Sequence, residues 1–248
     1  MNVFFWRVLI FFAFLGGWEA VARQLNPLLY VPPSTVGPAL VSVVTLESFP
    51  RLPDHLWLTL KEILIAYGLA VATGLGLGFG LGLWKTLGKV YGPILSALYA
   101  VPSVVWYPSL MLFFGLDATS KIAFGFLLGF FPIVLTVLAG IKQVDRHLIA
   151  VAQSMGAKPV TLFVKVMIPA MASTLVSGLR AGLALSVVGV IVGEVLGSRA
   201  GLGFLLNYTY GLLKTPEYVA LVVVAAVIVL AIDSLAALFE RRAKQWSE

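Results

Sequence analysis

Six long apolar runs constrain this chain more than any other feature. They cover residues 3–22, 56–84, 90–114, 121–140, 170–195 and 218–239. An α-helix rises about 1.5 Å per residue and the hydrocarbon core of a bilayer is about 30 Å thick, so about 20 residues are enough to cross it. The runs are apolar on every face, whereas the strands of a membrane barrel alternate polar and apolar residues. We therefore expect an all-α, polytopic protein with six transmembrane helices in a lipid bilayer.

Composition excludes several other classes of protein. Hydrophobic residues make up 60% of the 248 residues. Charged residues make up 11%, against about 25% in soluble domains. The net charge of +6 comes from Lys and Arg residues near the ends of the apolar runs, which indicates membrane topology rather than nucleic-acid binding. The chain has no cysteine, so disulfides and thiolate chemistry are excluded.

The sequence also lacks the residue patterns of an enzyme. His55 and His147, the two histidines, fall on opposite sides of the predicted membrane, the carboxylates are scattered, and the serines have no nearby base. The phosphate-binding pattern G-x-x-x-x-G-K-[ST] is absent. We therefore expect a non-catalytic chain that binds no metal or cofactor, and any ATP and Mg²⁺ would be bound by a separate subunit.

Lys and Arg residues also predict the orientation. With both termini in the cytoplasm, ten of them lie inside and six lie outside, as the positive-inside rule favours. The first run has an alternative interpretation as a cleaved signal peptide that ends at Ala20-Val21-Ala22. We favour a retained helix because the first positive residue, Arg7, follows an apolar start. The Pro-rich stretch that follows predicts an amphipathic helix over 35–46 on the outer surface.

Glycines recur in the second and fifth runs. Glycines four residues apart share one helix face and allow a neighbouring helix to approach closely. The sequence therefore predicts close helix packing at these positions. They are Gly74, Gly76, Gly78, Gly80, Gly82, Gly189, Gly193 and Gly197.

Residues 145–169, here called the polar segment, form the one long polar interruption between apolar runs. Leu148, Ile149, Ala152 and Met155 recur at helical spacing. Gly156 suits the left-handed position that ends a helix. Pro159 suits the first turn of a second helix, which would run into the fifth span. The product is a short helix with an apolar face at the membrane surface, which either enters a groove on a partner or rests on lipid headgroups.

The polar segment resembles the EAA loop of ABC importer permeases, in which E-A-A, three residues, Gly, nine residues and I-x-L-P follow one another. Here Ala150-Val151-Ala152, Gly156 and Val166-Met167-Ile168-Pro169 stand at those positions, and Ala150 replaces the glutamate. Pro32-Pro33-Ser34 and Gly201-Leu202-Gly203 match further parts of the pattern. From Leu56 to the C-terminus, the chain looks like the permease subunit of the nitrate, sulfonate and taurine group of type I ABC importers.

This resemblance implies a type I importer fold and a set of partners. These are a second permease copy in a homodimer, cytosolic ATPase subunits and an extracytoplasmic binding protein, all at a bacterial inner membrane. It implies three regions: a first helix with an outer segment (1–54), a transport core (55–240) and a cytoplasmic tail (241–248). It also implies that the polar segment holds the coupling helix. The expected ATPase-coupling residues are Ala150, Val151, Ala152, Gln153, Ser154, Met155, Gly156, Ala157 and Pro169.

Two charges inside the fifth run are candidates for the substrate pathway, since such charges are costly and usually functional. Arg180 lies about 16 Å along the helix from Pro169, near mid-membrane, where it could hold a sulfonate, nitrate or carboxylate. The alternative is a buried ion pair. Glu194 either lines the outer vestibule or caps a loop. An anionic solute is therefore expected, with a pyrimidine precursor, riboflavin or an aromatic acid as alternatives, and an ATP-independent transporter or channel as the rival function.

Overall fold

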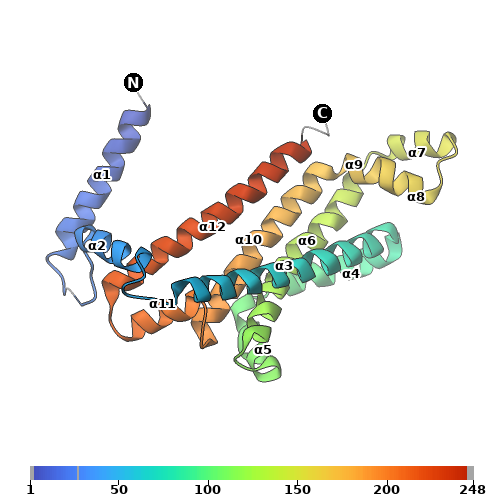
Figure 1. Ribbon diagram of the computed structural model, residues 1–248. Coiled ribbons are helices and arrows are strands. Elements are labelled where there is room, and N and C mark those ends of the chain that lie inside the picture. Colours follow the sequence, from blue (N-terminus) through green and yellow to red (C-terminus); the bar gives the residue numbers. More distant parts are fainter. Residues whose placement is uncertain (1–2, 27, 245–248) are drawn as a thin grey trace. The chain divides into compact units, whose positions relative to one another are not determined.

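Helices joined by short loops make up the described part of the protein, which is residues 3–26 and 28–244 of a computed structural model (Figure 1). Within it, five helices are long and apolar enough to cross a membrane. Each overlaps a run that the sequence predicts as a span, so the expected all-α membrane fold is confirmed. The five are α1 (Val3–Ala22), α3 (Leu52–Leu83), α6 (Ala118–Gln143), α10 (Ala172–Gly197) and α12 (Thr215–Lys244).

The sixth candidate span is broken. Helix α4 (Lys85–Ala100) is followed by the 3-10 turn η1 (Ser103–Trp106) and the helix α5 (Tyr107–Phe114). The chain bends by 88° between α4 and the η1–α5 part. The sequence predicts one span over 90–114, and the structure divides this stretch into two helical parts, which count as the sixth span if they are taken together. Pro102 has no N–H and disfavours helical backbone at the residue before it, and Val101 accordingly has an extended ψ of 131°. Hydropathy continues through the break, which is why composition alone does not reveal it.

Packing divides the chain into two compact units, Met1–Leu58 with Glu194–Ile228 and Thr59–Gly193 with Val229–Glu248. In the first unit, α2 (Pro33–Val44) and α11 (Leu202–Gly211) contribute to one buried apolar cluster that includes Val43 and Leu221. Helix α2 is the predicted amphipathic helix, and it begins at a proline because that residue suits the first turn. Helix α11 is not predicted by the sequence pattern.

Glycines place α3 directly against α6 in the second unit. A Cβ atom added to Gly74 would lie 2.8 Å from Ile133, one added to Gly78 would lie 2.7 Å from Val137, and one added to Gly82 would lie 2.3 Å from Ile141. These contacts repeat every four residues on both helices, so each branched side chain of α6 fills the space that a glycine leaves. The predicted close packing is confirmed for this face, whereas Gly76 and Gly80 have open space beside them.

Glycines also bring α6 close to α10. A Cβ added to Gly189 would lie 2.7 Å from the Cα atom of Gly125, and one added to Gly182 would lie 3.0 Å from the carbonyl oxygen of Gly129. Helix α6 therefore packs against α3 and α10 at near-backbone distance. Buried Tyr107 secures the start of α5 to this core, because its hydroxyl donates a 2.6 Å hydrogen bond to the carbonyl of Gly193.

We expect Gly78→Ala to destabilise the protein and Gly76→Ala to leave it unchanged or slightly more stable. The new methyl at position 78 meets Val137, and overpacking of this kind costs about 1–3 kcal/mol. At position 76 the methyl meets open space, and alanine favours a helix over glycine by about 1 kcal/mol. Thermal unfolding of the purified protein in detergent measures both changes. Val137→Ala should rescue Gly78→Ala, and equal unfolding temperatures for the two single variants would contradict this packing.

Candidate functional site

The polar segment begins with a capped helix. Helix α6 ends at Gln143, and after two residues with extended backbone the helix α7 (Arg146–Ser154) starts. The side chain of Asp145 accepts a 2.8 Å hydrogen bond from the backbone N–H of His147. This cap satisfies one of the donors that a helix start leaves without an internal partner. The first residue of α7 is therefore fixed by local chemistry.

The end of α7 is equally well defined. Gly156 has φ +77°, its N–H donates to the carbonyl of Gln153 at 2.9 Å, and the N–H of Ala157 donates to the carbonyl of Ala152 at 3.0 Å. This pair of bonds is the Schellman motif, in which a glycine in left-handed conformation closes a helix. Helix α8 (Pro159–Leu162) then begins with a proline in its first turn. The predicted roles of Gly156 and Pro159 are confirmed.

The path from α8 into α10 differs from the expected continuous helix. A π-helical turn (Phe163–Met167) and the short α9 (Ile168–Ala170), which contains Pro169, come first, and Met171 separates α9 from α10. A π turn has a wider hydrogen-bond spacing than an α-helix and often marks a functional site. Figure 1 shows α7 and α8 side by side beyond the end of α6.

Apolar contacts hold α7 against the ends of the membrane helices. Half-buried Ile149 packs on a buried cluster that includes Val144, Met167 and Met171. The ring of Phe163 packs edge-on against Phe79 of α3, with centroids 4.9 Å apart. Ile149 and Phe163 thus connect the polar segment to the apolar cluster at the ends of these helices.

The other face of α7 is apolar and exposed. Leu148, Val151 and Met155 are 50%, 59% and 83% exposed, and their spacing of three and four residues puts them on one helix face. Ala152 is half-buried with Ile149 on the inner face, so the apolar residues of α7 form two stripes rather than the single face expected. Ala150, Gln153 and Ser154 are exposed, and the Ser154 hydroxyl donates to the carbonyl of Ala150 at 2.9 Å. An exposed apolar stripe on a rigid helix can fill a groove of a partner.

Arg180 of α10 lies in an ion-pair network. Its guanidinium forms two hydrogen bonds to the carboxylate of Asp233, at 2.9 and 2.7 Å, and a third to Glu240 at 2.8 Å. Both acidic residues belong to α12, and the hydroxyl of Ser177 lies 3.4 Å from the second Glu240 oxygen. Arg180 is thus the positive partner that a carboxylate at Asp233, inside an apolar helix, requires. A role of Arg180 in the substrate pathway stays a prediction.

Glu240 is not predicted from the sequence. The last span is expected to end at residue 239, whereas α12 continues to Lys244 and keeps Glu240 on the helix. Residues 245–248 of the predicted tail lie outside the described residues. A signal was present: Asp233 and Glu240 are seven residues apart, so two helical turns place both carboxylates on one face.

Glu194 caps a helix in the first unit. It is fully buried, and its carboxylate accepts a 2.7 Å hydrogen bond from the N–H of Gly203, at the start of α11. Gly201 has φ +105°, and a Cβ there would lie 2.2 Å from the same carboxylate. The N–H of Gly201 donates to Nδ1 of His55 at 2.9 Å. The capping alternative therefore describes the position of Glu194, and a place in the pathway stays a prediction.

Among the described residues, no group of three or more His, Asp and Glu side chains is arranged to hold a metal ion. The site thus consists of a rigid apolar stripe on α7, an ion-pair network between α10 and α12, and a tightly packed helix core.

Comparison with known proteins identifies the family of this chain. Residues 70–245 match the family described as binding-protein-dependent transport system inner membrane component. The chain is 30% identical to the taurine transport system permease protein TauC of Escherichia coli K12, over 92% of this chain and 84% of that protein. It is 35% identical to the riboflavin transport system permease protein RibX of Chloroflexus aurantiacus, over 65% of this chain and 60% of that protein.

The fold has a solved counterpart. A chain from the MetNI methionine ABC transporter in an inward facing conformation aligns with a TM-score of 0.63 and 20% identity, over 79% of this chain and 98% of that chain. This likeness concerns the fold, and the family match extends over well over half of the sequence. The chain therefore belongs to the family of inner membrane components of binding-protein-dependent transport systems, and it is a permease subunit of an ABC importer.

Proposed function

We propose that α7 is the coupling helix of this permease and that its exposed stripe docks into a groove of a separate ATPase subunit. One observation carries the proposal: Leu148, Val151 and Met155 are exposed on a helix whose two ends are capped and whose other face packs on the membrane helices. Loose apolar loops would collapse onto the protein or lipid. A capped helix holds its apolar face in place for a partner.

The remaining partners follow from the same assembly. The chain lacks a phosphate-binding G-x-x-x-x-G-K-[ST] pattern, so ATP and Mg²⁺ bind to the ATPase subunit. A second copy of this chain completes the pathway as a homodimer, and an extracytoplasmic binding protein delivers the solute. Exposed Lys142, Arg146, Lys158 and Lys165 surround α7, which supports a cytoplasmic position for the polar segment and both termini.

In this mechanism each nucleotide state of the ATPase favours one conformation of the permease. Closure of two ATPase subunits on ATP moves the α7 helices, and the contacts of Ile149 and Phe163 pass the movement to the membrane helices. The paired permeases then open outward and receive a small solute, and hydrolysis resets the inward state. The taurine and riboflavin relatives support a small organic solute. The expected anion depends on Arg180, and two carboxylates already surround that residue.

Purification of the full chain from its native membrane tests this function. We expect a Walker-motif ATPase to copurify in a stable complex, and we expect vesicles that contain the complex and its binding protein to accumulate solute only with ATP. A purified chain that brings lipid but no ATPase would overturn the proposal. Solute movement that continues without nucleotide would also overturn it.

A further inference from the structure

The break between α4 and η1 opens a hollow in the second unit. Its volume is about 250 Å³, slightly below the range of about 300–1,000 Å³ for pockets that hold drug-sized ligands, so only a small solute fits. Non-helical backbone is tolerated at membrane depth where it is buried in protein or lines a water-filled cavity. Val101 and Pro102 provide such backbone, and both line the hollow together with residues of α6 and α10. Broken helices of this kind form solute sites in other transporters.

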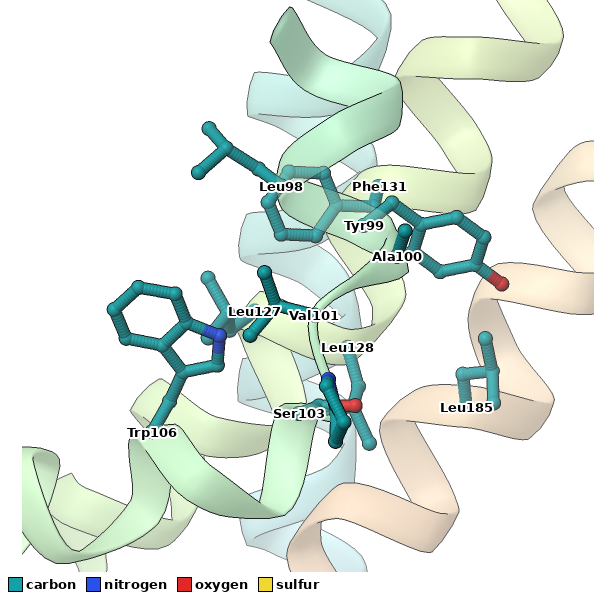
Figure 2. A pocket seen from close by; sticks show the side chains of 11 residues that line it. Leu98, Tyr99, Ala100, Val101, Ser103, Trp106, Leu127, Leu128, Phe131 and Leu185 are labelled. Atoms are coloured by element: carbon teal, nitrogen blue, oxygen red, sulfur yellow. The ribbon is translucent and has the colours of Figure 1, made fainter.

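Three aromatic side chains line this hollow beside four leucines. Tyr99, Trp106 and Phe131 line it, and the rings of Tyr99 and Phe131 lie 6.0 Å apart at an angle of 36°. Figure 2 shows Trp106 and Tyr99 on opposite sides of the turn that contains Val101 and Ser103. The hydroxyls of Ser103 and Tyr99 and the indole N–H of Trp106 are the polar side-chain groups among them. Flat apolar faces with a few hydrogen-bonding groups are typical of sites for ring compounds.

The described lining of the hollow offers no charged side chain to pair with an ion. Of the eleven residues that line it within the described chain, none is charged. Arg180 is not among them, and its guanidinium is bound by Asp233 and Glu240, a group of three with a formal charge of −1. An unpaired anion taken out of water costs several kcal/mol. A sulfonate or nitrate therefore gains little here, whereas an uncharged ring can stack.

We propose that this hollow binds the transported solute during its passage and that it selects an uncharged compound with a planar aromatic or heteroaromatic ring. Trp106 stacks on the ring, and the Ser103 hydroxyl bonds a polar substituent. The inference rests on the proposed function, because it assigns the solute class of the same importer. It also replaces the expectation of an anion that Arg180 suggests.

The absence of native cysteine makes a direct test possible. Ser103→Cys places a single thiol in the hollow, and Ser48→Cys places one in the exposed turn after α2. The purified complex in lipid nanodiscs is alkylated with N-ethylmaleimide in the presence of nicotinamide, cytosine, taurine or nitrate. We expect nicotinamide and cytosine to slow the reaction at position 103, and taurine and nitrate to have no effect. At position 48 no compound should change the rate.

A second substitution separates stacking from simple access. Trp106→Leu in the Ser103→Cys background should raise the nicotinamide concentration for half-protection about two- to ten-fold, since it removes the aromatic face that stacks on the ring. Trp106→Phe should keep most of the protection. Equal protection by taurine and nicotinamide, or no protection by either ring compound, would overturn the inference.

The same preparation keeps the two proposals apart. Its ATPase content and ATP hydrolysis are measured before alkylation. A complex with ATP hydrolysis but without ring-specific protection overturns the solute class alone. Ring-specific protection in a preparation that lacks an ATPase overturns the coupling proposal alone.

Discussion

Val151→Glu is expected to weaken the ATPase complex about 30-fold, the effect of losing about 2 kcal/mol at an interface hot spot, and to stop ATP-driven transport. Val151 is 59% exposed at the centre of the α7 stripe, so the glutamate does not disturb the protein's own packing. Its carboxylate would instead be buried against the partner. The measurements are the ATPase retained on purification and the ratio of solute transported to ATP hydrolysed. Transport and retention at the wild-type level would contradict docking by this stripe.

Two further substitutions in the polar segment have a matched control. Gly156→Trp imposes a side chain on a backbone with φ +77°, which disrupts the end of α7, and Ala152→Glu disturbs its half-buried face. Gly115, at the end of α5, also has φ +77° and open space beside it. Gly115 also has ψ −172°, a conformation nearly restricted to glycine, so Gly115→Trp imposes backbone strain of at least this size outside the segment. We expect it to keep normal coupling, while the two variants in the segment hydrolyse ATP without transport.

Arg180→Gln is expected to abolish transport while the permease still assembles. The change removes the hydrogen bonds to Asp233 and Glu240 and leaves two carboxylates on one face of α12 without their positive partner. Charges within membrane helices require such partners. ATP-dependent uptake in vesicles, together with the amount of complex recovered, measures the two effects. Unchanged uptake would contradict any role of this arginine.

A neutral version of the network distinguishes its two interpretations. The triple variant Arg180→Gln, Asp233→Asn, Glu240→Gln removes all three charges, so no carboxylate is left unpaired. If the network only joins α10 to α12, this variant should recover much of the uptake that Arg180→Gln loses. If Arg180 contacts the solute, uptake should stay absent. The first result is the one that the ring-selective hollow predicts.

Local patterns in the sequence were sufficient for much of the fold. Spans follow from hydropathy because a helix must cover its backbone in lipid, and α1 matches its predicted range residue for residue. Gly156 and Pro159 were predictable because the left-handed turn and the first helical turn depend on backbone chemistry at one position. The spacing of the glycines predicts which face of α3 packs closely on another helix. It does not predict the partner residues on that helix, which are Ile133, Val137 and Ile141.

The misses depend on three-dimensional neighbours. Lys61 and Glu62 are neighbours on α3, yet Lys61 is exposed and Glu62 is buried, because adjacent helix residues point about 100° apart. Lys121, at the start of the fourth apolar run, is buried, and its ammonium donates to the carbonyls of Leu116 and Asp117. Periodicity alone does not say which face another helix will cover.

The spacing of glycines on α3 also limits how the permease can change shape. The side chains of three α6 residues pack into the gaps that glycines leave on α3. Ile133 packs at Gly74, Val137 at Gly78 and Ile141 at Gly82. Sliding of α3 along α6 would remove all three branched side chains from these gaps at once. We therefore expect the two helices to move together as one rigid unit. Any conformational change of the permease would then occur at other helix–helix contacts.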